Sequence, residues 1–350
     1  MKIAFTVNPG IEDIVAEEAR AELGGKPVYN MLSGYVFLEE PKQGIEGIYR
    51  LRTINRAMIL LTVIDNIRPD YSYLPELKAI LEKNLGNIVE YVTPETSFAV
   101  QVERMGRHEY TSMDIARIVG DVVISITTKF YGRRPPVNLR NPNIIVHVFL
   151  REERLLAGIV LTGPWSMHRR GYRVYDHPAA LKPTLAAAML YISGTRDKQV
   201  IVDPMCGGGT IPIEAALLHE DAVIIGTDIN PVHIKGARYN AVAAGVAGKT
   251  TFKVWDARRI HELLSNIDHM ILNPPYGIRY GDPWSIRRLY RKFLESAWKA
   301  LNDGGRLTMI TTEFSYVHRI AEEIGYKIVH ERTVFHGNLY PHIMVLEKSR

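Results

Sequence analysis

The stretch QVIVDPMCGGGTIPIEAA, at residues 199–216, decides the fold. A β-branched run ends at Asp203, glycines occupy positions 207–209, and Thr210 with Pro212 opens a helical pattern. Such glycines let the backbone turn tightly and approach a ligand closely. The GKS or GKT ending of a phosphate-binding loop is absent, and a GxGxxG dinucleotide turn does not fit. The stretch predicts a strand, a ligand-binding turn and a helix, with a plain strand–helix connection as the alternative.

Around this stretch, β-runs and helical patterns alternate to the end of the sequence, which predicts a doubly wound α/β sheet. The ligands of such sheets bind at the carboxyl ends of the strands. We therefore expect the chemistry in the residues that end or follow each strand. The predicted strands are 199–202, 223–226, 251–254, 269–272, 306–311, 327–330 and 343–346.

Acidic residues recur at three of these strand ends, as Asp203, Asp228 and Asp256. Each alone is more often a cap or turn residue. Together they offer acceptors for a ribose diol, an adenine amine and an ammonium group, all of which S-adenosylmethionine carries. We therefore expect S-adenosylmethionine as the cofactor, bound by the strand ends and the residues beside them: Asp203, Met205, Cys206, Gly207, Gly209, Thr210, Asp228, Ile229, Asp256, Ala257 and Asn273.

The fourth predicted strand ends in NPPYG, residues 273–277. The side-chain carbonyl of Asn273 and the backbone carbonyl of Pro274 are two acceptors that suit one NH₂ group, because proline fixes the turn and removes a donor. Tyr276 offers a ring on which a planar base can stack. We expect Asn273, Pro274 and Tyr276 to be catalytic, with a self-satisfied tight turn as the alternative. No covalent nucleophile is needed, and Cys206 is interpreted as a small packing residue.

The first 66 residues show a βαββαβ order, which is typical of a ferredoxin-like domain. Residues 67–162 predict a second small α/β domain, in which Thr111 and Asp114 form a capping-box-like helix start. Residues 163–180 lack a clear period and predict a linker before the domain at 181–350.

The net charge of +5 is unevenly distributed. Residues 1–100 carry −4, residues 101–180 carry +5 and residues 181–350 carry +4. A basic middle segment suggests a surface for a polyanion, although a solvated basic face is the alternative. The arginines that we expect to contact RNA are Arg107, Arg133, Arg134, Arg140, Arg169, Arg170, Arg287, Arg288 and Arg291.

Two segments carry a resemblance to known families. RMGRHEYTS at 104–112, followed by a helix and VNLRNP at 137–142, resembles the THUMP domain of tRNA-modifying enzymes. The segment from 181 onward resembles the class I Rossmann-like methyltransferases, and its NPPY motif resembles those that methylate amino groups. Together they resemble the THUMP-containing tRNA (guanine-N2)-methyltransferases, which implies that tRNA is the partner and that the first two domains grip its acceptor end.

The same resemblance covers RRGYR at 169–173 and HPAALKPTLAAAML at 177–190. It implies that the cofactor is also lined by Pro178, Ala179, Ala180 and Leu181. NPPY implies guanine 6 as the target, whereas DPPY is usual for guanine 10, and an rRNA guanine is a further alternative. A glutamine or small-molecule amino methyltransferase and a non-catalytic RNA-binding protein are the alternatives from other classes.

The composition, 46% hydrophobic and 23% charged, is that of a globular protein. One cysteine excludes an intrachain disulfide, and no CxxC or His-rich spacing predicts a metal site. No window of about 18 uncharged apolar residues predicts a membrane span. We expect a cytoplasmic protein with no metal and no obligate protein partner.

Overall fold

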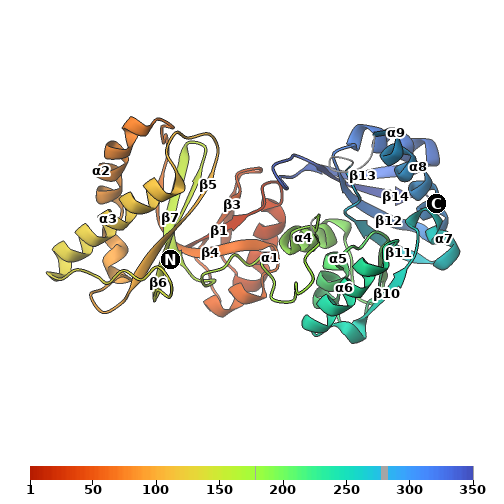
Figure 1. Cartoon of the computed structure of the whole chain (residues 1–350), viewed down its shortest axis with the longest axis horizontal. Coiled ribbons are helices and arrows are strands. Elements are labelled where there is room, and N and C mark those ends of the chain that lie inside the picture. Colours follow the sequence, from red (N-terminus) through yellow and green to blue (C-terminus); the bar gives the residue numbers. More distant parts are fainter. Residues whose placement is uncertain (178, 277–282, 350) are drawn as a thin grey trace.

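The computed structural model describes residues 1–177, 179–276 and 283–349, and this part of the chain forms two seven-stranded sheets. Figure 1 shows them side by side along the long axis of the molecule, the first sheet at the left and the second at the right. None of the helices in these ranges is long and apolar enough to cross a membrane.

The first sheet begins with four antiparallel strands in the order β2-β3-β1-β4. The second helix of the expected βαββαβ order is a 3₁₀ helix, Ile45–Arg50. The first α-helix ends at Leu23, because Gly24 and Gly25 both have positive φ angles. The elements are β1 (Lys2–Val7), α1 (Glu12–Leu23), β2 (Lys26–Tyr29), β3 (Tyr35–Glu39), η1 (Ile45–Arg50) and β4 (Ile54–Ile64).

Three further strands continue the same sheet, because β4 pairs with β7 and the order runs on as β4-β7-β6-β5. The predicted capping box is confirmed: the Thr111 hydroxyl accepts from the Asp114 amide at 3.2 Å, and the Asp114 carboxylate accepts from the Thr111 amide at 2.8 Å. The elements are η2 (Tyr71–Tyr73), α2 (Leu74–Asn84), η3 (Gly86–Glu90), β5 (Phe98–Met105), α3 (Ser112–Tyr131), β6 (Ile144–Arg151) and β7 (Arg154–Val160).

All three of these α-helices cover one face of the first sheet. Ile3 pairs with Ile59, Ile59 with Ile159, and Ile159 with Val146, so these four side chains share a face. They pack against the cores under α1 and under α2 and α3. The opposite face carries a small apolar cluster and several charged side chains.

The second sheet confirms all seven predicted strands, in the order β10-β9-β8-β11-β12-β14-β13. Its first five strands in this order are parallel, and β14 is antiparallel to both of its neighbours. The elements are α4 (Pro183–Ser193), β8 (Val200–Asp203), α5 (Thr210–Leu218), β9 (Val223–Asp228), α6 (Pro231–Ala243), η4 (Ala247–Lys249), β10 (Thr250–Val254), η5 (Ala257–Arg259), α7 (Ile260–Leu263), β11 (Ile267–Leu272), α8 (Pro283–Ala300), β12 (Leu301–Thr311), α9 (Phe314–Ile324), β13 (Tyr326–Thr333) and β14 (His342–Lys348).

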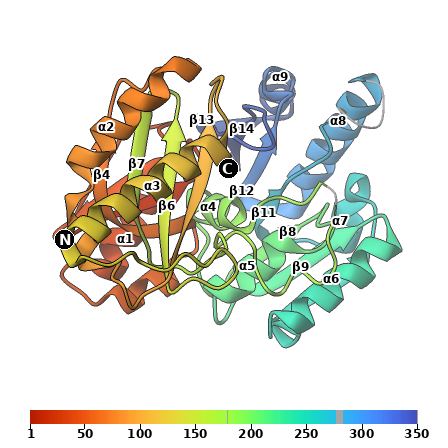
Figure 2. The ribbon, with the colours of Figure 1, turned by 60° about the vertical axis from the view of Figure 1, so that its left-hand side comes forward.

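The two halves meet at α4, which Figure 2 shows between the first sheet and the second. One hydrophobic core extends across this boundary, from Phe5 and Leu23 to Leu185 and Ile201. Beside it, the buried Glu214 of α5 pairs with Arg52, at 2.7 Å, and with Arg170, at 3.3 Å. The halves are therefore joined by a common core and a buried ion-pair network.

Candidate functional site

Four polar residues meet at the carboxyl edge of the second sheet, because β10, β9, β8 and β11 are neighbours in that order. Asp203 is the last residue of β8 and Asp228 the last of β9. Asp256 follows β10 by two residues, and Asn273 follows β11 directly. The structure therefore brings together the three carboxylates and the asparagine that the sequence predicted at this edge.

The glycine turn lies between these acids and is bonded to two of them. The Met205 amide donates to the Asp203 carboxylate at 3.0 Å, and the Gly207 amide donates to the Asp228 carboxylate at 3.0 Å. Gly207 and Gly209 have positive φ angles of 50° and 80°. A side chain at Gly209 would also lie within 3.0 Å of Ala237. The turn therefore needs glycine both for its backbone angles and for its packing, and Gly209 caps α5, which begins at Thr210.

Asp203 and Cys206 lie in the least solvated part of the site. Burial raises the pKa of the Asp203 carboxyl well above its ordinary value, and the Asp228 carboxylate adds to the rise. Burial, with the same two carboxylates, also raises the pKa of the Cys206 thiol well above its usual range. A cationic ligand would offset the cost of ionising Asp203. This donor set fits the sulfonium and ammonium charges of S-adenosylmethionine, and the thiol keeps its proton.

Asp228 and Asp256 are oriented by their surroundings in different ways. Asp228 also accepts from the Asn230 amide at 2.8 Å and lies 3.2 Å from His233 Nδ1. Asp256 is bound by the guanidinium of Arg258, which lowers the pKa of its carboxyl. Asp228 Oδ2 accepts one bond, from the Gly207 amide, and keeps a lone pair for a ribose hydroxyl. Both oxygens of Asp256 already accept from Arg258, so the proposed bond to adenine would replace one of those contacts.

Tyr175 and His177, two residues of the predicted linker that were given no role in the site, cover the glycine turn. The ring of Tyr175 lies 2.2 Å from the place that a side chain at Gly236 would take. His177 contacts the turn at Gly207 and packs edge-on against His233, with ring centroids 4.4 Å apart. Glycine inside a helix such as α6 is costly, so Gly236 was the signal for this close approach.

The residues expected to line the cofactor before the first strand have different surroundings. Pro178 lies outside the described residues. The Ala179 carbonyl accepts from Asn273 Nδ2 at 3.2 Å, and Ala180 is partly exposed. Leu181, 2% exposed, packs in the core shared by the two halves.

Two residues beside the acidic strand ends also differ. Ala257, 5% exposed, packs under β11 and α8, so its side chain is turned into the core. Ile229, 64% exposed, stands beside Asp228 and is free to contact a planar ligand.

Asn273 is held by bonds at both ends of its amide. Its Nδ2 donates to Ala179, and its Oδ1 accepts from the Tyr276 hydroxyl at 2.8 Å. Burial raises the pKa of Tyr276, so its hydroxyl stays protonated and can donate. Tyr290 anchors the turn by donating to the Pro275 carbonyl at 3.0 Å. The Tyr276 hydroxyl thus has an orienting contact that the sequence analysis did not foresee, and Gly277 lies outside the described residues.

The arginines expected to bind RNA fall into two groups. Arg107, Arg134, Arg140, Arg169 and Arg288 are exposed. Others are paired: Arg133 with Glu95, Arg287 with Glu313, and Arg291 with Glu323.

Arg170 differs from the expectation. Its side chain is 12% exposed, pairs with Glu214 and donates to the Arg52 carbonyl at 2.9 Å. Its charge is therefore committed to the junction of the two halves, and it does not belong with the exposed arginines.

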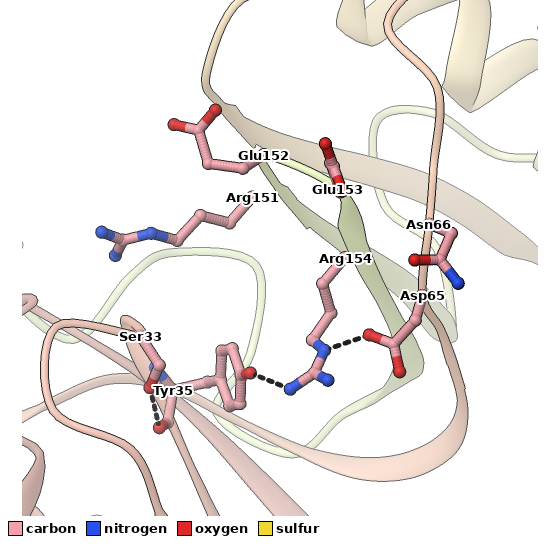
Figure 3. A pocket seen from close by; sticks show the side chains of 8 residues that line it. All are labelled: Ser33, Tyr35, Asp65, Asn66, Arg151, Glu152, Glu153 and Arg154. Carbon is pink, nitrogen blue, oxygen red and sulfur yellow. Dashed lines mark hydrogen bonds and ion pairs between the residues drawn. The ribbon is translucent and has the colours of Figure 1, made fainter.

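A separate pocket of about 390 Å³ lies at the first sheet, away from these strand ends. Figure 3 shows Arg154 in it, bonded to Tyr35 and to Asp65. Three carboxylates and two arginines line the pocket, so it offers no excess of positive charge. Within the described ranges, no group of three or more His, Cys, Asp or Glu side chains is arranged to hold a metal ion.

Comparison with known proteins agrees with this geometry. Residues 170–342 match the RMKL-like methyltransferase domain, and residues 80–160 match the THUMP domain. The tRNA (guanine(6)-N2)-methyltransferase of Archaeoglobus fulgidus is 35% identical, over 97% of this chain and 90% of the relative. The enzyme of the same name from Thermus thermophilus is 30% identical, over 99% of this chain and 100% of the relative.

Solved structures show the same fold. The crystal structure of TrmN from Thermus thermophilus has a TM-score of 0.79 and 28% identity, and the match covers 99% of each chain. The crystal structure of SMU.472 complexed with SAH has a TM-score of 0.79 and 21% identity, and the match covers 100% of this chain and 98% of that one.

Proposed function

The chain belongs to the family of THUMP-containing tRNA (guanine-N2)-methyltransferases, and we propose that it methylates the exocyclic N2 of guanine 6 in the acceptor stem of tRNA. The protein is an enzyme, and its methyl donor is S-adenosylmethionine. When bound, this cofactor supplies an electrophilic methyl group on a sulfonium. The observation that carries the proposal is the oriented amide of Asn273, at the same sheet edge as the glycine turn.

The turn at Asn273 can hold the reacting amine. A guanine amine is a poor nucleophile because its lone pair is delocalised into the ring. Asn273 Oδ1 accepts one bond from Tyr276 and keeps a second lone pair, which one amine proton can use. The Pro274 carbonyl accepts the other proton in this proposal. Two such bonds favour a pyramidal nitrogen and direct its lone pair, so catalysis is mainly positioning, with effective molarities of ~10⁵ M or more available.

A guanine in a paired stem must leave its helix to reach this turn, which costs a few kcal/mol. Stacking on the ring of Tyr276 would return roughly 1–3 kcal/mol of that cost. The exposed arginines at 107, 134, 140 and 169 are proposed to hold the RNA backbone while the base is out of the stem.

The choice of guanine 6 rests on the names of relatives that are 30–35% identical over nearly their whole length. The Ribosomal RNA large subunit methyltransferase K/L of Methylococcus capsulatus is 27% identical but aligns over 49% of its own length, which keeps an rRNA guanine as the second candidate. We propose that the enzyme acts in the cytoplasm, where its buried free cysteine stays reduced.

We also propose the division into a ferredoxin-like domain at 1–66, a THUMP domain at 67–162, a linker at 163–180 and a methyltransferase domain at 181–350. The first two share one sheet through the pairing of β4 with β7. Residues 161–182 form no helix or strand within their described part, and they run beside β4, where the Met167 amide donates to the Asn55 carbonyl at 2.7 Å.

The test is methylation of a tRNA transcript, a transcript with guanine 6 replaced, and an rRNA fragment, followed by nuclease digestion and mass spectrometry. We expect N2-methylguanosine only in the first. Product at guanine 10 or only in rRNA would reject the site. A methyl group on a ring carbon, a ribose oxygen or a protein glutamine would reject the reaction.

A further inference from the structure

A polar cluster lies on the face of the first sheet that the helices leave uncovered, where it meets the start of α4. Strand register places five of its members on this face: Thr6 of β1 opposite Arg56 of β4, and Gln101 of β5 opposite His147 of β6, with Glu103 two residues along β5.

Two further residues of the cluster lie outside the strands. Asn8 follows β1, and Lys182, just before α4, donates to Asn8 Oδ1 at 3.5 Å. We call these seven residues the junction cluster: Thr6, Asn8, Arg56, Gln101, Glu103, His147 and Lys182.

Several atoms of the junction cluster are buried without a hydrogen-bond partner in the described part of the chain. They are Thr6 Oγ1, Asn8 Nδ2, Gln101 Oε1 and both ring nitrogens of His147, whose side chain is 1% exposed. Buried polar groups are normally paired, and an unpaired one is costly. These five atoms on one face of the sheet and at its edge have hydrogen-bonding capacity that the described residues leave unused.

The charges of the cluster favour an anion. Two cations, Lys182 and Arg56, interact with one carboxylate, Glu103, which therefore compensates them only in part. Burial lowers the pKa of both cations and raises that of Glu103, so each of the three groups is less stable in its charged form than in water. Burial lowers the pKa of His147 to about 3 and that of the neighbouring His168 to about 4, so neither adds positive charge at neutral pH. Arg169 and Arg173 lie near His168, and Arg173 is paired with Asp176 at 2.6 Å. A surplus of part-buried positive charge is stabilised by an anionic ligand.

The cluster lies next to the methyl-transfer turn. Lys182 follows Leu181, and two residues earlier the Ala179 carbonyl is bonded to Asn273. Arg56, Gln101, Glu103 and Lys182 all keep part of their surface exposed, so a ligand can reach them.

We propose that the junction cluster binds a backbone phosphate of the substrate RNA beside the flipped guanine, with Lys182 and Arg56 as the charged donors. This inference rests on the proposed function and names a contact that the exposed arginines of the loop at 131–143 do not supply.

The first test compares Lys182→Met with Lys83→Met, which removes the same charge from an exposed position on α2. We expect Lys182→Met to weaken tRNA binding by roughly tenfold or more and to lower the salt slope of the affinity by about 0.7–0.9. S-adenosylmethionine affinity should be unchanged, and Lys182→Arg should restore tRNA binding. Unchanged tRNA affinity in Lys182→Met would overturn the proposal.

A second test locates the phosphate. Two tRNAs are made, each with one phosphate next to guanine 6 replaced by a neutral methylphosphonate, on the 5′ or on the 3′ side. At one of these linkages the replacement should weaken binding to the wild-type protein, but it should weaken binding to Lys182→Met little further. Equal additional losses in both proteins at both linkages would reject the contact. If Lys182→Met lowers the melting temperature of the protein, Arg56→Met replaces it in the same binding measurements. If the wild-type protein methylates no tRNA guanine, the proposed function is wrong. The methylation assay on the wild-type protein shows this before any variant is made, so it is distinguished from a failure of the phosphate contact.

Discussion

The two sheets of this protein assemble their polar groups in opposite ways. In the second sheet, Asp203, Asp228 and Asn273 end or follow neighbouring parallel strands, so each lies in a short motif of its own. In the first sheet, Thr6, Arg56, His147 and Gln101 lie within strands and not after them, and pairing register places Thr6 opposite Arg56 and Gln101 opposite His147. The comparison teaches that a site at strand ends can be predicted from local sequence, whereas a site on a sheet face depends on register.

The largest effect on the free energy of unfolding should come from breaking the ion pairs that Glu214 forms between the two halves. Glu214→Ala leaves Arg52 and Arg170 without their buried partner and removes the acceptor of the Tyr172 hydroxyl, at 2.7 Å. Breaking a buried pair in this way costs about 3–5 kcal/mol. Chemical denaturation should show this loss, with Glu220→Ala, at an exposed position, as the control. A loss confined to the second half would show that the halves unfold independently.

Asn273→Ala should have the next largest effect, and it tests the strand-end site alone. It removes one proposed amine acceptor and leaves the glycine turn intact, so methyl transfer should fall by roughly 10²-fold or more, as for other oriented polar groups in active sites. Calorimetry should show a much smaller loss of S-adenosylmethionine affinity, because Asp203, Asp228 and the glycine turn stay in place. Tyr276→Phe keeps the ring and removes the bond to Asn273 Oδ1, so a smaller loss is expected. Full activity in Asn273→Ala would refute the two-acceptor arrangement.

The limits of sequence prediction follow the same division. The seven strands of the second sheet, the glycine turn and the Thr111 cap all depend on neighbours close in sequence. The contact of Tyr175 with Gly236 and the pairing of Glu214 with Arg52 join residues that are far apart in sequence. The local sequence around each of them does not indicate which residue it contacts. Arg170 was assigned to RNA because its charge is visible in sequence and its burial is not.

Asp228→Ala should weaken S-adenosylmethionine binding, because it removes the proposed ribose acceptor and the partner of the Gly207 amide. Hydrogen bonds to charged groups contribute about 1.5–3 kcal/mol, so we expect a dissociation constant raised at least tenfold. Asp256→Ala should have a smaller effect, since Arg258 already binds that carboxylate. Equal affinities for wild type and Asp228→Ala in calorimetry would remove Asp228 from the site.

Asp203→Asn should raise stability while it lowers S-adenosylmethionine affinity. The pKa of Asp203 is higher in the folded state than its ordinary value of 3.8. Ionisation of this buried carboxyl therefore costs stability, and the cost grows as pH rises from 3.8 to the folded-state pKa. The stability advantage of Asp203→Asn should be absent at low pH and fully present above that pKa. A difference in melting temperature that is constant with pH would contradict this assignment.

The smallest effects should come from the exposed arginines of the loop at 131–143, which contrast with the part-buried cations of the junction cluster. Arg134→Ala and Arg140→Ala should each lower the slope of log affinity for tRNA against log salt by about 0.7–0.9, because each removes one phosphate contact. Arg133→Ala should change the slope less, since Glu95 already pairs with that guanidinium. Methylation at saturating tRNA should stay near the wild-type rate in all three, because none of these side chains is part of the strand-end site. If the three variants leave the salt slope unchanged, the RNA binds to another surface of the protein, and the arginines of this loop only form a solvent-exposed basic face.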